Sequence, residues 1–195
     1  MKNEKEYLML RDEITWRLKL VDSLATFAYT AVVTILGVAL SMDVIELFLL
    51  PYVVIVPVAL KVANHKYAVA YLAGYMNRVL ENEKDVECFK WERYHEKYYK
   101  LNSRNIREKI IYYGSSVEYI VMSLLSSILF WGKYIKQEEI QFTVAQVYGY
   151  IVLQIIVVMF VTYISISYMS FQKTKPRTFN NWERVLRAEV KDDKK

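Results

Sequence analysis

Residues 23–42, SLATFAYTAVVTILGVALSM, decide the fold of this chain. The stretch has twenty residues without a charged side chain, and as a helix it would rise roughly 30 Å, the thickness of a bilayer hydrocarbon core. Its small and hydroxyl-bearing residues recur every three or four positions, which places them on one stripe of a helix. They are Ser23, Thr26, Thr30, Thr34, Gly37 and Ser41. Because such a stripe lets a second helix approach closely, we predict a membrane span with a helix-packing seam.

The rest of the chain repeats this alternation of apolar and charged segments. Of 195 residues 54% are hydrophobic, and the net charge is +5. The apolar residues lie in long charge-free runs that a soluble protein of this size could not easily bury. We therefore predict an all-α integral membrane unit over residues 1–195, with four transmembrane helices at about 23–42, 44–64, 110–132 and 140–171. The last of these spans has a similar seam, which includes Gln146 and Gln154.

Three charged segments are predicted to form helical extensions outside the bilayer. Residues 1–22 form an amphipathic helix, since their apolar positions have helical spacing. Residues 65–109 continue the second span as a cytosolic helical segment, and residues 172–195 form a basic tail that turns at Pro176 before a short amphipathic helix. Candidates for a partner surface are the aromatic residues of the last two segments: Trp91, Tyr94, His95, Tyr98 and Trp182. Interleaved acidic residues argue against nucleic acid as the partner.

Basic residues divide unevenly between the two sides of the predicted spans. Residues 1–22, 61–109 and 172–195 carry 24 of the 26 Lys and Arg, and the segment 133–139 carries the other 2. The positive-inside bias then places both termini and residues 65–109 in the cytoplasm. We predict a multi-pass protein of the inner (plasma) membrane, and the net positive charge favours contact with anionic lipid headgroups.

The sequence lacks the motifs that a membrane enzyme needs. It contains one cysteine and two histidines, and it shows no metal-ligand spacing, no nucleophile elbow and no glycine-rich phosphate loop. We therefore expect no catalytic residue, no metal and no cofactor.

Glu118 is the one carboxylate inside a predicted span. An ionisable group in a bilayer is costly and usually faces protein or water. One interpretation is a carboxylate that lines a cation path or gate in an oligomer. Another is a hydrogen bond to Gln154, a Tyr or a Ser of another span, with Lys61 and His65 as further plausible partners. A third is a side chain that snorkels to the interface or stays neutral.

The second predicted span contains two prolines, Pro51 and Pro57. They should bend this helix or leave carbonyls free at Leu47 and Val53, because proline removes a backbone donor. A kinked, well-packed helix is one interpretation, and the hinge of a gate is the other.

The first half of the chain also resembles a known group of proteins. Four runs carry the resemblance: YLMLRDEITWRL at 7–18, LATFAYTAVVTILGVAL at 24–40, LLPYVVIVPVAL at 49–60 and AYLAGYMNRVLE at 70–81. Together, residues 7–91 resemble a widespread group of small bacterial membrane proteins in which an Arg-x-Glu-Ile entry, here Arg11, Glu13 and Ile14, precedes two spans and a cytosolic helix. Proteins of this kind resemble membrane components of prokaryotic anti-phage systems and mobile elements, so the resemblance implies a role in defence.

Two functions are consistent with these observations. The first is a non-enzymatic membrane protein that forms homo-oligomers through its seams and presents a cytosolic helical surface to a soluble protein partner. The second is an oligomeric pore or ion channel, lined on the Glu118 side, that depolarises the membrane when triggered.

Overall fold

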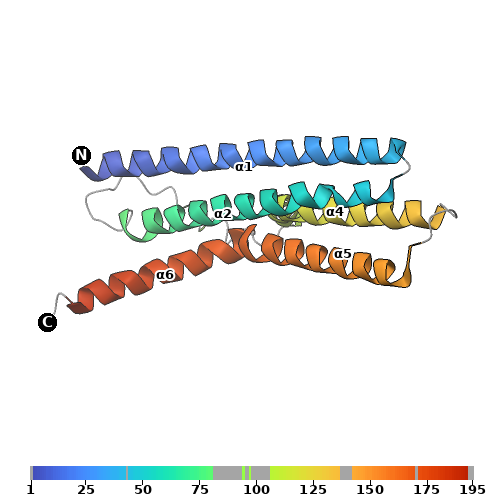
Figure 1. Cartoon of the computed structure of the whole chain (residues 1–195). Helices are drawn as coiled ribbons and strands as arrows, with labels where there is room; N and C mark the ends of the chain where they lie inside the picture. The colour runs from blue at the N-terminus through green and yellow to red at the C-terminus, as the bar shows by residue number, and fades with distance from the viewer. Residues whose placement is uncertain are drawn as a thin grey trace.

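The computed structural model describes residues 2–42, 44–80, 94, 97, 106–136, 142–169 and 171–192, and every element in these ranges is a helix. The first hairpin consists of α1 (Lys2–Ser41), the 3-10 helix η1 (Ile45–Leu49) and α2 (Pro51–Arg78). The second consists of α4 (Ile106–Lys136) and α5 (Val144–Ile164), followed by the π-helix η3 (Ser165–Met169) and α6 (Phe171–Asp192). The helices form an elongated bundle in which α1 begins and α6 ends at the same end (Figure 1). The prediction of an all-α fold is confirmed for the described residues.

Within these residues, three helical stretches are long and apolar enough to cross a membrane: Glu4–Ser41, Ile45–Arg78 and Val144–Met169. They contain the first, second and most of the fourth predicted span. The third predicted span, 110–132, lies inside α4, which is not one of the three.

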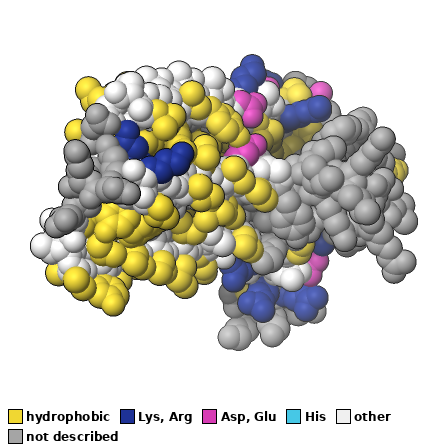
Figure 2. All heavy atoms as spheres, turned by 90° about the vertical axis from the view of Figure 1, so that its right-hand side faces the viewer, with side chains coloured by type: hydrophobic (Ala, Val, Ile, Leu, Met, Phe, Trp, Pro, Cys, Tyr) yellow, Lys and Arg dark blue, Asp and Glu magenta, His cyan; other side chains and the backbone are white. Residues whose placement is uncertain are grey.

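Hydrophobic side chains are exposed around one half of the bundle. We define the apolar half as residues 23–42, 45–64, 117–136 and 144–164, and the charged half as residues 2–22, 65–80 and 171–192. Large exposed side chains of the apolar half include Phe27, Val33, Val53, Ile128, Ile156 and Met159. Seen from the end that lies to the right in Figure 1, hydrophobic side chains form a contiguous surface (Figure 2). Such a surface marks contact with lipid or another protein.

α1 packs along α2 through a face that is different from the predicted seam. Its buried residues in the apolar half are Ala28, Val32, Leu36 and Ala39. The two alanines let the helix backbones approach closely. Thr30 lies two positions after Ala28, about 200° around the helix, so the seam is on the side away from α2.

Each proline of the second predicted span has a definite place in the structure. Pro51 occupies the first turn of α2, where its missing N–H costs nothing, and Pro57 lies inside the helix. The predicted free carbonyl at Leu47 is wrong, because the N–H of Leu50 donates to it at 3.2 Å. The 3-10 turn that precedes Pro51 provides this donor.

The serines of α4 attach this helix to the start of the second span. The Tyr52 hydroxyl lies 2.5 Å from Ser127 Oγ and donates to the carbonyl of Ser123 at 3.2 Å, while Ser126 donates to the carbonyl of Phe48. Both Ser123 and Ser126 are fully buried. The polar side of α4 therefore stabilises the packing of α4 against η1 and α2.

α5 begins later, and ends earlier, than the predicted span 140–171. Thr143 and Gln146 form a capping box: the Thr143 hydroxyl accepts from the Gln146 backbone, and the Gln146 side chain accepts from the Thr143 backbone. The chain then passes through η3 into α6. The predicted turn at Pro176 is wrong, since Pro176 lies inside α6.

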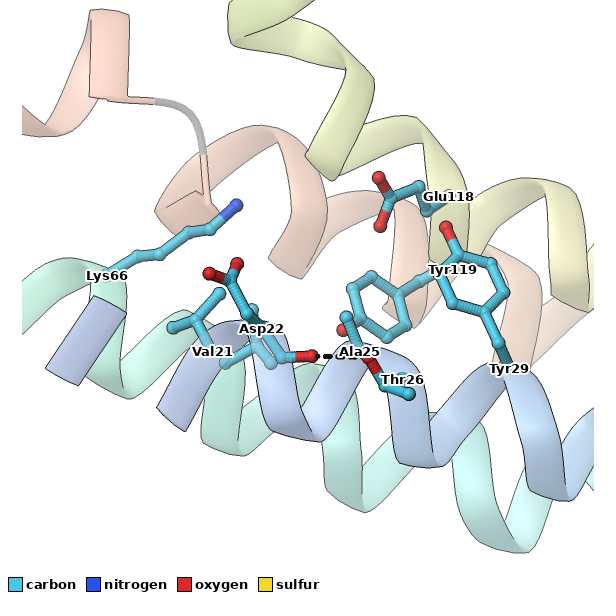
Figure 3. A pocket seen from close by; sticks show the side chains of 9 residues that line it. Val21, Asp22, Ala25, Thr26, Tyr29, Lys66, Glu118 and Tyr119 are labelled. Carbon is cyan, nitrogen blue, oxygen red and sulfur yellow. Dashed lines mark hydrogen bonds between the residues drawn. The ribbon is translucent and has the colours of Figure 1, made fainter. Parts of the chain in front are cut away.

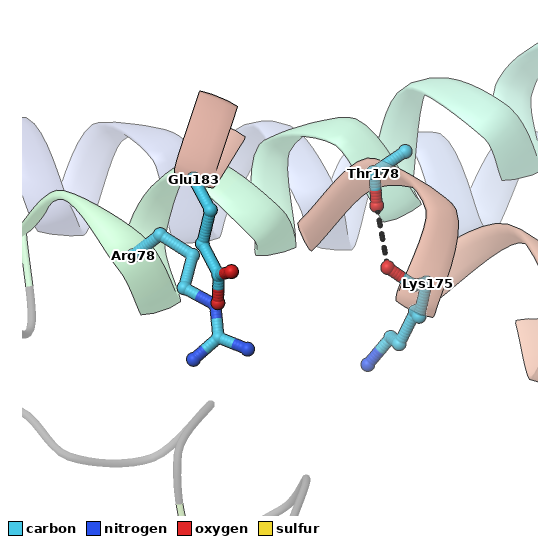
Figure 4. A network of polar contacts seen from close by, with 4 residues as sticks. All are labelled: Arg78, Lys175, Thr178 and Glu183. Carbon is cyan, nitrogen blue, oxygen red and sulfur yellow. Dashed lines mark hydrogen bonds and ion pairs between the residues drawn. The ribbon is translucent and has the colours of Figure 1, made fainter. Parts of the chain in front are cut away.

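In the charged half, α6 packs against the second half of α2. Trp182 Nε1 donates to the carbonyl of Tyr71 at 3.1 Å, and Thr178 Oγ1 donates to the carbonyl of Ala70 at 2.9 Å. Thr178 also donates to the carbonyl of Lys175, and Arg78 pairs with Glu183 at 3.2 Å (Figure 4). Tyr75, also on α2, donates to Glu6 of α1 at 2.8 Å. Thus α1, α2 and α6 form one packed unit.

Candidate functional site

A polar pocket lies where the apolar half meets the charged half. Its volume is about 250 Å³. α1, α2 and α4 all contribute to its walls (Figure 3). We call it the boundary pocket, and its lining residues are Val21, Asp22, Ala25, Thr26, Tyr29, Val62, Lys66, Glu118 and Tyr119.

Three charged side chains from three helices meet at this pocket. Lys66 of α2 is 3% exposed, and its ammonium group interacts electrostatically with Glu118 of α4 and Asp22 of α1. The Tyr29 side chain reaches across from α1 toward the Glu118 carboxylate (Figure 3). A buried lysine is stable only when opposite charge compensates for its desolvation, so these carboxylates hold it in place.

Tyr119 adds a buried polar group to the lining of the pocket. The residue is 1% exposed, and its buried hydroxyl has no hydrogen-bond partner among the described residues. A buried hydroxyl without a partner costs free energy, which a ligand or a water molecule in the pocket would recover.

Comparison of the chain with protein-family models, with curated proteins and with solved structures gives no match.

The structure gives Glu118 partners that differ in part from the predicted ones. The side chain faces Tyr29, which agrees with the interpretation that a Tyr of another span is the partner. Gln154 instead accepts a hydrogen bond from Trp131 Nε1 at 2.9 Å, which links α5 to α4. Lys61 is exposed, and neither Lys61 nor His65 lines the boundary pocket; the lysine that does is Lys66.

The six seam residues of α1 are all exposed in the single chain. Thr26, Thr30 and Thr34 each donate to the carbonyl four residues earlier, and Ser41 donates to the carbonyl of Val38. A Cβ added at Gly37 would meet no described atom within 4 Å. The seam is therefore an exposed surface on which the hydroxyls of these three threonines and Ser41 are already satisfied. Gln146 is exposed and caps α5, whereas Gln154 is buried and pairs with Trp131, so Gln154 belongs to the contact between α4 and α5.

The candidate partner surface is divided by the structure. Trp182 packs against the rings of Tyr71 and Tyr75, with ring centroids 4.9 and 5.0 Å apart, and so belongs to the contact between α6 and α2. Tyr94 is helical and 61% exposed. Trp91, His95 and Tyr98 lie outside the described residues.

Sequence reasoning missed the boundary pocket, although a signal for it was present. Asp22 directly precedes the first apolar run, and Lys66 closely follows the second. In an antiparallel hairpin these two ends lie at the same level, so their opposite charges meet. Glu118 alone was recognised, because it interrupts an apolar run.

Proposed function

We propose that this chain is a non-enzymatic, four-span membrane protein that forms homo-oligomers and presents its charged half to a soluble cytosolic protein. In this proposal α4 crosses the bilayer together with α1, α2 and α5, and both termini face the cytoplasm, as the distribution of basic residues favours. The observation that carries the proposal is the exposed seam of α1 within an apolar surface.

The chemistry of the seam supports self-association. Inside a bilayer, helices associate where small residues permit close backbone approach, and Gly37 with its neighbouring hydroxyl residues offers this. The opposite face of α1 is already occupied by α2. Every copy of the chain carries the same seam. We therefore propose that the seam of one copy packs against the seam of a second copy.

Cysteine cross-linking in membranes tests the self-association. Thr34→Cys and Gly37→Cys, in a Cys88→Ser background, should give disulfide-linked dimers after mild oxidation. Val32→Cys, which faces α2, is the matched control and should give none. Equal cross-linking at all three positions, or none at any, would contradict the proposal.

The partner surface requires a separate test. Tyr94 is exposed, and the outer side of α6 carries exposed basic residues such as Arg177, Arg184 and Arg187. If these residues bind an acidic protein surface, replacing the three arginines with Gln should abolish recovery of that partner after gentle detergent extraction. Recovery that survives both this variant and deletion of residues 81–105 would refute the proposed surface.

The boundary pocket favours a second candidate function, an oligomeric channel. Its carboxylates and tyrosines would line part of a cation path if several copies brought their pockets together. Ion flux from liposomes that contain the protein would support it, provided that Glu118→Gln alters the flux. Absence of flux from liposomes with oligomeric protein would rule the channel out.

Because residues 7–91 resemble membrane components of anti-phage systems, we propose a role in defence for both candidates. Expression of the gene with its neighbours should reduce phage plaque counts, and Gly37→Leu should remove this protection if the oligomer is the active form. Unchanged plaque counts with the intact gene group would exclude this role.

A further inference from the structure

The boundary pocket opens sideways between two helices. α1 and α4 both pack on α2, and among the described residues few backbone positions of α1 and α4 lie close to each other. The pocket is therefore a crevice, with Val62 and Lys66 of α2 as its floor. Thr26 and Tyr29 on its α1 wall are exposed. If the apolar half resides in a bilayer, as proposed above, this opening lies at the level of the lipid headgroups.

The charges of the crevice select a cation. Asp22 and Glu118 supply two carboxylates against the single ammonium of Lys66, so one negative charge remains uncompensated when all three are ionised. The buried Tyr119 hydroxyl adds a hydrogen-bonding group without a partner among the described residues. Val21, Ala25 and Val62 provide apolar wall between these groups. The lining thus suits a cation that is joined to methylene groups.

We propose that the crevice binds the primary ammonium of an aminophospholipid headgroup, of the phosphatidylethanolamine type. A primary ammonium donates three hydrogen bonds, for which the carboxylates and the phenol oxygens are acceptors. A quaternary ammonium has no N–H to donate and is bound instead by aromatic cages. The acyl chains would lie against exposed apolar side chains on the same helix faces, such as Val33, four residues after Tyr29, and Val121, three residues after Glu118.

The size and composition of the crevice argue against a bare metal ion. Its volume of about 250 Å³ greatly exceeds the ~15 Å³ that one water molecule needs. Among the described residues, no three His, Cys, Asp or Glu side chains are grouped as metal ligands. At equal distance, the positive charge of Lys66 on the floor would also repel a divalent cation about twice as strongly as a singly charged ammonium.

Native mass spectrometry of the full-length protein in detergent tests this inference. Phosphatidylethanolamine and phosphatidylcholine with identical acyl chains would be titrated separately. We expect the first to bind about tenfold more tightly, and Glu118→Gln to weaken its binding at least about fivefold while leaving phosphatidylcholine binding unchanged. Glu46→Gln is the matched control, because it makes the same change at the other end of the bundle, where Glu46 is exposed. This control should retain full preference for phosphatidylethanolamine.

Each other outcome overturns the inference. Equal affinity for the two lipids, or an unchanged preference in both Glu118→Gln and Asp22→Asn, would show that the crevice does not select the ammonium. Saturation by free glycerophosphoethanolamine at the same concentration would identify a soluble ligand rather than a lipid. Displacement of the lipid by 100 mM sodium, but not by choline, would identify a metal-cation site. A protein that needs no detergent to stay in solution would instead refute the proposed membrane residence, so the two failures are distinguishable.

Discussion

At the scale of single residues, Gly74 lies where α6 approaches α2 closely. A Cβ at this position would lie 2.9 Å from Trp182 Cδ1 and 3.1 Å from Phe179 Cδ1. Neither ring can move freely, because Trp182 donates to the carbonyl of Tyr71 and Phe179 is buried. Glycine at this position is therefore what lets α6 approach α2.

Gly74→Ala should lower the free energy of unfolding by about 1–3 kcal/mol, the usual cost of overpacking a well-packed contact. Thermal unfolding in detergent micelles, followed by circular dichroism, would measure the change. Gly132→Ala is the control, since a Cβ there meets no described atom within 4 Å, and it should leave stability unchanged or raise it by up to ~1 kcal/mol. Equal effects of the two substitutions would refute the tight contact.

Lys66 and Lys61 lie on the same helix but in different environments. Lys66 is buried beside two carboxylates, whereas Lys61 is exposed. Lys66→Met should lower the free energy of unfolding by about 2 kcal/mol, because it leaves Asp22 and Glu118 without their cation. The loss is smaller than for a fully buried ion pair, because Asp22 is exposed to solvent. Lys61→Met should change stability by less than ~0.5 kcal/mol. Adding Glu118→Gln to Lys66→Met should restore part of the loss, and a purely additive double variant would contradict the proposed interaction.

At the scale of elements, the start of α5 depends on the capping box of Thr143 and Gln146. Thr143→Ala removes the hydroxyl that accepts from the Gln146 backbone, and this should cost about 1 kcal/mol. Hydrogen exchange should show faster exchange confined to the first turn of α5, with α1 and α2 unaffected. Thr143→Ser, which keeps the hydroxyl, is the matched control and should behave like the natural protein.

The sequence predicts most of the elements because their apolar runs are long and free of charge. Residues 23–41 and 144–164 are helical in the structure, as their composition indicates. The boundaries between elements are harder to predict, because they depend on contacts between residues that are far apart in the sequence. The stretch 1–42 was divided into two helices on composition, but nothing in it interrupts the backbone, and α1 is continuous.

α6 passes through Pro176, because the contacts of Thr178, Phe179 and Trp182 with α2 compensate for the lost backbone hydrogen bond.

The candidate site could be predicted only in part. Glu118 is visible in the sequence because one charge stands in an apolar run. Asp22 and Lys66 flank the first two apolar runs, but other charged residues, such as Lys61, lie there as well, and composition does not show which of them is buried. Their positions depend on the register between α1 and α2. The buried face of α1 that contains Ala28 determines this register, and composition does not reveal it.

At the scale of the whole molecule, the number of membrane crossings depends on α4. Ile135, near its end, is 77% exposed, and Lys61 lies on α2 near the boundary of the two halves. If α4 crosses the bilayer, a membrane-impermeant maleimide should label Ile135→Cys in intact cells of an expression host, in a Cys88→Ser background. Lys61→Cys should be labelled only after the membrane is permeabilised. Protection of Ile135→Cys in intact cells would show that α4 does not cross.

α1 and α2 pass from the charged half to the apolar half without a break in either helix. A rigid rod transmits torque and axial displacement over its whole length, and α1 is about 60 Å long. A small rotation imposed on residues 2–22 would therefore reappear as the same rotation at Thr34 and Gly37. Binding of a partner to the charged half would therefore be coupled to the packing of neighbouring copies at the seam. No break in α1 separates the two regions.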